Sequence, residues 1–561
     1  MPQQRIVIIS GKTFSGKSSL AELLKTEHGF EIVRSRDILT RSLQLEPDHA
    51  DRRPLIDQAR DEDSQSDSRW VLNGVMARLE GLPPEKSVVV DQVSSPSQVL
   101  AFRKEFGSQL AHVHLYASQE TLQERFQHTE PERATETKYT EIDHLNDDND
   151  VVWLMRDADV RINTTRTDAR DCLVRVAARL KLFAPAFDRL VDVLIGGQLG
   201  SEGKGNIAAY LAPEYDVLVR VGGPNAGHTI ATPDGKNYVH HHLPSGCGSV
   251  SAKVLLGPGT TINVKSLLEE IEQCKIDPER LFIDPQALII EESDIEKEKK
   301  TVVGAIASTG SGSGAASARR IEERGSGTVR LARDVPELSP YVGTEGNYRG
   351  RTLDRLEDAY RAGYSVLLEG TQGSALSIFH GKYPWVTSRD TNVAGCLVEA
   401  GISPGRVRRV IMVVRTTPIR VANPDGNSGN ISGHIKHETS FHTVAKEAHL
   451  DGEKLVTDEI TSTTRRHRRV GWFDWEQFRV ACMLNTPTDL VLTFADYLDE
   501  KNTRARRFEQ LAPDTIKFVQ ELERVAQAPV SLINTRFLRE GDDFMDRRTT
   551  LDRRSWSGRR K

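Results

Sequence analysis

Two glycine-rich segments, each with a lysine, have the composition of loops that hold the phosphates of a nucleotide. The first, Gly11–Ser18, reads GKTFSGKS and fits the pattern G-x-x-x-x-G-K-[ST] without a gap. In such a P-loop the backbone N–H groups around Gly11 and Gly16 enclose the β-phosphate. Lys17 would bridge the β- and γ-phosphates as a catalytic group, and the Ser18 hydroxyl would ligate Mg²⁺. The alternative is a purely structural glycine turn.

A P-loop needs a partner carboxylate at the end of a second buried strand. The run SVVVDQV places Asp91 directly after three valines, as a ligand of Mg²⁺, and Asp37 in SRD is its rival. Arg125, in QERF, is either a lid arginine or an ordinary surface charge. Two charged segments, Asp61–Arg69 and Thr129–Asp150, are either solvated loops or a kinase lid.

The second glycine-rich segment, Gly196–Asn206, reads GGQLGSEGKGN. Its glycines surround Lys204 without the P-loop spacing, so alone it is a weak phosphate-binding signal. The turn GGPNAGHT follows and holds His228 beside Asn225. A lone histidine is usually structural, but one that follows a phosphate loop is a good candidate for a general acid.

Each loop begins an α/β unit, because a run of β-branched residues precedes it and a helix is expected after it. The stretch LKLFAPAFDRL (Leu180–Leu190) marks the boundary between them. We therefore expect an N-terminal domain over residues 1–183, a second domain over 190–540 and a basic tail over 541–561 that is disordered or packed on the surface. The glycine- and serine-rich Ser308–Ser317 is expected to be a mobile loop.

The composition is that of an ordinary globular protein. The 561 residues carry a net charge of -5, which gives no reason to expect a nucleic-acid partner. The five cysteines are dispersed without a C-x-x-C pair, which argues against a disulfide framework and against a zinc site. There is no long apolar run for a membrane helix and no room for a signal peptide before RIVIIS, so the cytoplasm is the expected location.

From Val191 onward the chain resembles the adenylosuccinate synthetase family. GGQLGSEGKGN corresponds to the family's G-D-E-G-K-G-K loop, and NAGHT to its N-A-G-H-T turn. Further matching segments follow in order: HHLPSG, STGSGSG, LEGTQGS, YPWVTSRDT, PIRVA, TSTTRRHRRVGW and LTFADYLD. The N-terminal layout resembles nucleoside-monophosphate and dephospho-coenzyme A kinases. The two resemblances imply a three-layer P-loop kinase-like α/β domain that uses ATP, followed by a ligase-type α/β domain.

The family resemblance implies a chemistry for the second domain. A nucleoside triphosphate phosphorylates O6 of a 6-oxopurine nucleotide, and the amine of L-aspartate then displaces the phosphate. His228 is implied as the donor to O6, and Lys204 with the main-chain carbonyl of Gly227 as the holders of the phosphoryl group and Mg²⁺. The implied aspartate clamp is Thr463, Thr464, Arg466 and Arg468. The positions that match nucleotide contacts are Gly200, Glu202, Gly203, Gly205, Asn225, Thr309, Gln372 and Thr387.

The residue before E-G-K-G departs from the family. Adenylosuccinate synthetases have an aspartate there, which takes the N1 proton of IMP and ligates Mg²⁺, whereas this chain has Ser201. A shorter side chain leaves room for the 2-amino group of guanine, as in the phage branch of the family that joins aspartate to dGMP. The expected substrate is therefore dGMP; the alternatives are IMP with GTP, or a non-catalytic nucleotide sensor.

The phosphoryl donor and the oligomeric state are also inferred from the resemblance. Phe494 stands where GTP-using relatives have a lysine, and Asp496 is retained to read a guanine base. ATP, dATP and GTP therefore all stay open as donors. The relatives are homodimers that lend an arginine across the interface, and Arg324 is the candidate here, with an ordinary surface arginine as the alternative.

Overall fold

The computed structural model describes residues 4–42, 52–131, 139, 148–231, 237–343, 350–423, 431–461, 466–536 and 544–548. The chain divides into two compact units, Met1–Phe183 and Ala184–Lys561. No described helix has the length and apolar character needed to cross a membrane.

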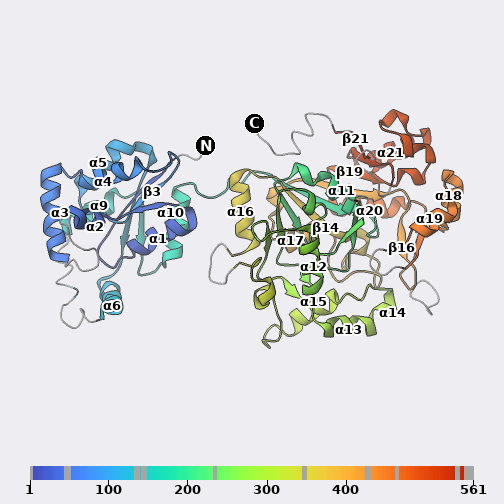
Figure 1. Ribbon diagram of the computed structural model, residues 1–561, viewed down its shortest axis with the longest axis horizontal. Helices are drawn as coiled ribbons and strands as arrows, with labels where there is room; N and C mark the ends of the chain where they lie inside the picture. Colours follow the sequence, from blue (N-terminus) through green and yellow to red (C-terminus); the bar gives the residue numbers. More distant parts are fainter. Residues whose placement is uncertain are drawn as a thin grey trace. The chain divides into compact units, whose positions relative to one another are not determined.

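The first unit is built on a parallel five-stranded sheet in the order β2-β3-β1-β4-β5 (Figure 1). Its strands are β1 (Ile6–Ser10), β2 (Glu31–Val33), β3 (Val88–Val90), β4 (Leu110–Tyr116) and β5 (Val160–Asn163). Its helices are α1 (Lys17–His28), α2 (Ser35–Ser42), α3 (Arg52–Ser66), α4 (Trp70–Leu79), α5 (Pro96–Phe106), α6 (Gln119–Thr129), α9 (Asp148–Asp157) and α10 (Ala169–Arg179).

Alternate residues of β1 enter two different cores, which makes this unit a three-layer structure. Ile6 and Ile8 pack with residues of α4 and α5, whereas Val7 and Ile9 pack with residues of α1 and α10. A strand buried on both faces needs the continuous apolar run that β1 has. The predicted three-layer α/β fold is confirmed.

The second unit contains a nine-stranded sheet in the order β12-β10-β7-β14-β6-β15-β19-β20-β21, parallel except at β21. Its strands are β6 (Val191–Gly196), β7 (Val217–Arg220), β10 (Lys253–Leu256), β12 (Leu281–Ile283), β14 (Val366–Gly373), β15 (Val407–Arg415), β19 (Asp489–Thr493), β20 (Val530–Asn534) and β21 (Phe544–Asp546). Apolar cores cover both faces.

Smaller elements complete this unit (Figure 1). The short strands form a hairpin, a two-stranded pair and a three-stranded sheet: β8 (His228–Ala231), β9 (Asn237–His240), β11 (Thr261–Ile262), β13 (Leu288–Ile289), β16 (Ile419–Val421), β17 (Glu438–Thr439) and β18 (Arg468–Gly471). The helices are α11 (Lys204–Leu211), α12 (Val264–Cys274), α13 (Glu292–Thr301), α14 (Val303–Ile306), α15 (Ser313–Glu322), α16 (Thr352–Ala362), α17 (Val393–Ala400), α18 (Phe441–Ala448), α19 (Gly452–Asp458), α20 (Trp475–Asn485) and α21 (Pro513–Ala526).

Two segments differ from the sequence expectations. Asp61–Arg69 is not a plain loop, because α3 continues to Ser66 and Asp63 accepts a hydrogen bond from the Trp70 indole. The Ser308–Ser317 loop gives way to α15 at Ser313, where the carboxylate of Glu298 accepts bonds from three backbone N–H groups at the helix start. Most of Thr129–Asp150 lies outside the described residues.

The sheet also continues past residue 540, where the second domain was expected to end. β21 pairs with β20 antiparallel, and Arg548 forms ion pairs with Glu214 and Asp546. The basic composition of this segment is therefore partly used inside the fold, because a buried guanidinium needs paired carboxylates. Residues 549–561 lie outside the described part of the chain.

Candidate functional site

A phosphate-type loop connects β6 to α11 in the second unit. Gly203 adopts a left-handed conformation with φ of 83° and begins the helix, a geometry that suits glycine. The Nζ atom of Lys204 lies 2.7 Å from Oε2 of Glu202 and 3.3 Å from the carbonyl oxygen of Gly200. Glu202 also accepts bonds from two backbone N–H groups of the loop. The loop is thus braced internally by a buried ion pair.

A cavity of about 700 Å³ opens beside this loop. It gathers residues from segments that are far apart in the sequence, as the resemblance implied. The predicted residues that line it are Gly200, Ser201, Gly203, Lys204, Gly205, Asn225, Gly227, His228, Thr309, Gln372, Thr387, Arg468 and Phe494.

Three of the predicted residues that the structure describes are not among those that line the cavity. Glu202 was predicted to contact nucleotide, but its buried carboxylate braces the loop, because Lys204 and two N–H groups occupy it. Asp496 and Arg466 are also absent from the lining. Thr463 and Thr464 lie outside the described residues.

His228 is held at the cavity wall by a buried network. Its Nδ1 atom lies 2.5 Å from Oε1 of Glu369 and 3.3 Å from the guanidinium of Arg220. Its Nε2 atom is buried and has no hydrogen-bond partner among the described residues. A Cβ atom at Gly205 would lie 2.9 Å from Cβ of His228, so only glycine allows this approach. The imidazole is oriented through one nitrogen, and its other nitrogen is left for a ligand.

The network also sets the charges at this wall. Burial, followed by the positive charge of Arg220, lowers the pKa of His228 to about 3. Burial raises the pKa of Glu369, but Arg220 and His228 outweigh it and bring the value to about 2. In the ligand-free protein the imidazole is therefore neutral beside an ionised carboxylate. Negative charge at Nε2 would favour the imidazolium.

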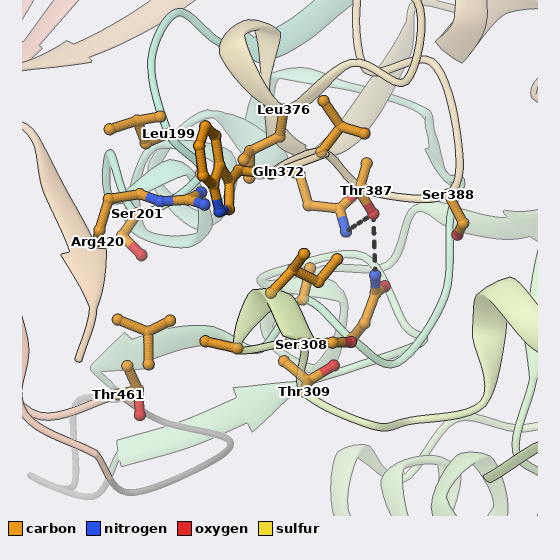
Figure 2. Close-up of a pocket in the computed structure, with 18 of the residues that line it drawn as sticks. Leu199, Ser201, Ser308, Thr309, Gln372, Leu376, Thr387, Ser388, Arg420 and Thr461 are labelled. Carbon is orange, nitrogen blue, oxygen red and sulfur yellow. Dashed lines mark hydrogen bonds between the residues drawn. The ribbon is translucent and has the colours of Figure 1, made fainter. Parts of the chain in front are cut away.

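Three polar side chains of the cavity are hydrogen-bonded together, and Figure 2 shows two of them, Gln372 and Thr387, side by side. Thr387 Oγ1 accepts bonds from Gln372 Nε2 at 2.9 Å and from Asn225 Nδ2 at 3.4 Å. Gln372 has a left-handed backbone with φ of 63°, which is uncommon for a residue other than glycine and is found at functional sites. All three residues were predicted to hold the purine nucleotide.

The basic residues near the predicted aspartate clamp are partly engaged in the protein. Arg468 Nη1 lies 2.6 Å from Oε2 of Glu459, which also pairs with Arg415. Arg466 has a buried Nη1 atom without a hydrogen-bond partner among the described residues. Thr461 lines the cavity beside Arg468. Of the predicted clamp, Arg468 therefore lines the cavity, and its two threonines are not described.

Phe494 and Asp496 were predicted to contact the base of the nucleoside triphosphate that donates the phosphoryl group. The ring of Phe494 lines the cavity, and the Arg415 guanidinium lies 3.9 Å over its centroid. Burial raises the pKa of the Asp496 carboxyl to about 7, against the opposing effects of its own backbone and Arg415. Its Oδ1 atom is shielded from solvent and has no hydrogen-bond partner among the described residues.

Three residues of the site were missed from the sequence. Glu369 and Arg220 are single charged residues inside apolar strands, and such isolated buried charges were the available signal. Arg420 lies in the matching PIRVA segment and lines the cavity on the same side as Ser201 in Figure 2. Burial, followed by the charge of Arg469, lowers the pKa of Arg420 to about 10.

The first unit holds a second cavity, of about 730 Å³, around the P-loop. It is lined by Gly11, Gly16, Lys17, Ser18 and Asp91. Lys17 Nζ donates to the carbonyl oxygens of Gly11 and Lys12, both at 2.8 Å. The predicted strand-loop-helix context is present. Asp91 follows β3, and burial raises the pKa of its carboxyl.

Of the other two residues predicted for this unit, Arg125 lies at the P-loop cavity and Asp37 does not. Arg125 donates to the carbonyl oxygens of Phe14, in the P-loop, and of Thr164, so it is not a simple surface charge. It also lines the cavity, whereas Asp37 lies in the first turn of α2 and is not part of the lining. Arg324, in the second unit, is exposed and donates to the carbonyl of Ile321.

The residues present fit Mg²⁺ at both cavities, because they offer hard oxygen ligands beside a phosphate-type loop. In the first unit these are the Ser18 hydroxyl and the Asp91 carboxylate, and in the second the Ser201 hydroxyl and the Gly227 carbonyl. The second set lacks a free carboxylate, so substrate phosphates would supply the negative ligands. A bound Mg²⁺ would offset charge on the transferred phosphoryl group.

Comparisons with known proteins divide the chain in the same way. The family model "Adenylosuccinate synthetase" matches residues 193–338 and 333–504, and the model "AAA domain" matches residues 7–145. Adenylosuccinate synthetase of Methanococcus maripaludis (strain C7) is 35% identical over 350 residues, which are 61% of this chain and 95% of that protein. The enzyme of Pyrococcus horikoshii is 34% identical over 366 residues, 64% of this chain and 99% of that protein.

Two solved structures share the fold of the second unit. Succinoaminodeoxyadenylate synthetase (PurZ) of cyanophage S-2L, bound to dGMP and to dATP as an energy donor, is 27% identical with a TM-score of 0.52, covering 66% of this chain and 99% of that chain. Adenylosuccinate synthetase of Plasmodium falciparum, 20% identical with a TM-score of 0.52, covers 64% and 99% and shows the fold alone. The chain therefore belongs to the adenylosuccinate synthetase family, as a ligase of that type fused to an N-terminal P-loop kinase-like domain.

Proposed function

We propose that the ligase domain joins the amine of L-aspartate to C6 of dGMP. The observation that carries the proposal is Ser201, which lines the same cavity as His228 at the position where the family has a longer carboxylate. A serine leaves space at the N1 and N2 edge of guanine and can accept a hydrogen bond from the 2-amino group. PurZ, a relative that shares the fold, was solved with dGMP, which supports this choice.

The proposed reaction has two steps. N1 of dGMP loses its proton as O6 attacks the γ-phosphorus of the triphosphate, and the nucleoside diphosphate leaves. The amine of aspartate then attacks C6, inorganic phosphate leaves with O6, and the amine loses a proton. The product is N6-succino-2-amino-dAMP.

The described side chains divide this work between them. Lys204 stabilises charge on the phosphoryl group as it transfers. His228 takes up a proton at Nε2 as negative charge develops on O6, and the imidazolium then donates to O6. Asn225, Gln372 and Thr387 orient the nucleotide, and Arg468 with the neighbouring basic residues binds the carboxylates of aspartate. This division is supported by the lining of one cavity, which includes Lys204, His228, Asn225, Gln372, Thr387 and Arg468.

The reaction is tested with the full-length protein, aspartate, Mg²⁺ and a triphosphate, given dGMP, GMP or IMP separately. Formation of the succinylated product from dGMP, with one phosphate released per product and none without aspartate, is expected. Turnover of IMP alone would assign the site to ordinary adenylosuccinate formation. Nucleotide binding without phosphate release from any pairing would assign it to a sensor.

We also propose that the N-terminal domain transfers a phosphoryl group from ATP to a nucleoside monophosphate. Lys17→Ala is expected to lower this activity by about 10²–10³-fold, because it removes the cation at the transferred phosphate. Ligase turnover should stay unchanged, since Lys17 lies in the other unit. The measurement is nucleoside diphosphate formation over a panel of monophosphates, with Lys25→Ala at the far end of α1 as the matched control. Equal activity of the two variants would remove the kinase assignment.

The choice of phosphoryl donor should depend on pH through Asp496. Its pKa lies at about 7, so the carboxyl becomes ionised as the pH rises through neutrality. An ionised carboxylate accepts bonds from N1–H and N2–H of guanine, so the KM for GTP should fall between pH 6 and pH 8. The KM for dATP should not fall in parallel, because adenine has no N1–H donor. A GTP response that survives in Asp496→Asn would contradict this role.

The ligase domain is further proposed to act as a homodimer with Arg324 at the partner's site. The residue is exposed, as such a role requires. Sedimentation of the wild type and Arg324→Ala, combined with their KM values for dGMP, separates a role in catalysis from one in assembly.

A further inference from the structure

Three potential metal ligands lie close together in the ligase domain, next to the hairpin that carries His228. His240 ends β9, Cys247 begins a short 3-10 turn (Cys247–Ser249), and Cys274 ends α12. One nitrogen of His240 and the two sulfur atoms all lie within 4.8 Å of one another. His240 and Cys247 are buried, with exposed fractions of 2% and 0%. Ligand atoms this close to one another can bind the same metal ion.

The chemistry of the group is that of a soft-metal site. Thiolates and imidazole are the ligands that Zn²⁺ prefers, at distances of about 2.0–2.3 Å. The Sγ atom of Cys274 lies 4.0 Å from Nδ1 of His240. Glu270, one helical turn before Cys274, places Oε2 3.9 Å from Nδ1 of His240.

We propose that His240, Cys247 and Cys274 bind one thiophilic metal ion of the Zn²⁺ class, with the Glu270 carboxylate as the neighbouring oxygen. This reverses the expectation from the dispersed cysteines. The two cysteines are far apart in the sequence and form no short motif, and only the fold brings them together. The site is separate from the two phosphate-binding cavities, because none of its three ligands lines either one.

Occupancy of this site would steady the strand that carries the catalytic histidine. His240 is the cross-strand partner of His228 in the β8–β9 hairpin. Arg220, which lies beside His228, also donates to the main-chain oxygen of His240 at 3.2 Å. A metal that fixes His240 therefore fixes both the hairpin register and the guanidinium beside the imidazole. The metal would position His228 and would not contact the substrate, because none of its three ligands lines the ligase cavity.

Co²⁺ is the probe, because thiolate coordination gives it an intense charge-transfer absorption that oxygen ligands do not give. Full-length protein, reduced and freed of metal by a chelator, is titrated with Co²⁺ and then with Zn²⁺. One equivalent of thiolate-bound Co²⁺ is expected, displaced by Zn²⁺, and Zn²⁺ should also raise the Tm. Both signals should be lost in Cys274→Ser and Cys247→Ser and kept in Cys482→Ser, which changes a buried cysteine of α20.

The outcome that overturns the proposal is measured on the wild type, so it does not depend on the folding of a variant. Absence of the absorption at saturating Co²⁺ would reject the site. An equal absorption in both cysteine variants would place the metal elsewhere. Loss of two free thiols on mild oxidation, without any metal binding, would identify the pair as a disulfide former instead.

Discussion

Replacing His228 by asparagine is expected to lower kcat for the ligase reaction by about 10²–10⁴-fold, which is the usual loss for a positioned general acid. The KM for dGMP should change little, because we propose that the hydrogen-bonded group of Asn225, Gln372 and Thr387 holds the nucleotide. The histidine is prepared for this task by its contacts. Glu369 fixes Nδ1 at 2.5 Å, and Nε2 is left for the ligand.

The reason for so large an effect lies in the protonation of the imidazole. Its pKa of about 3 keeps it neutral in the empty site, and a bond to the ionised Glu369 prepares it to accept a proton. Only the charge that develops on O6 favours the imidazolium, so the group acts in the transition state rather than in binding.

Steady-state kinetics with His241→Asn as the matched control will check this prediction. His241 neighbours the same network but does not line the cavity. If His228→Asn raised KM and left kcat unchanged, the histidine would be a binding residue, and the assignment would be wrong.

Replacing Ser201 by aspartate is expected to reverse the substrate preference. The kcat/KM for IMP should rise by about 10²-fold, because the variant regains a base at N1. The kcat/KM for dGMP should fall by about 10-fold or more, because a longer side chain crowds the 2-amino group. Ser201 lines the cavity, so the new carboxylate would enter the same space as the purine.

The variant Ser201→Ala distinguishes the effect of space for the 2-amino group from the effect of its hydrogen bond to Ser201. Alanine keeps the room for the 2-amino group, so this variant should still prefer dGMP, with a loss of about 10-fold or less that reflects one hydrogen bond. A preference for dGMP that persists in Ser201→Asp would show that another residue selects the base.

The sequence was sufficient for the two α/β units and for most of the ligase cavity. Loops such as Gly200–Gly205 carry their geometry in glycine spacing. The order of the family segments predicted one site for Asn225, Gln372 and Thr387, which line one cavity. The P-loop was equally readable, because its lysine and serine follow a strand of apolar residues directly.

Features that depend on packing between distant parts of the chain could not be predicted from the sequence. Glu202 looked like a nucleotide contact, and only the fold shows that it braces Lys204. Glu369 and Arg220 act through His228 from other strands, so no local pattern marks them. The meeting of Cys247 and Cys274 likewise arises from a turn and a helix end that the sequence does not relate.

A competition between dGMP and IMP tests the central claim most directly. Both nucleotides are supplied at equal concentration to the full-length wild-type protein with aspartate, Mg²⁺ and a triphosphate, and the two succinylated products are separated by mass. Their initial ratio equals the ratio of the two kcat/KM values. The predicted result is an excess of the dGMP product of at least about 10-fold. A dominant IMP product would contradict the assignment of this cavity to a 2-aminopurine nucleotide.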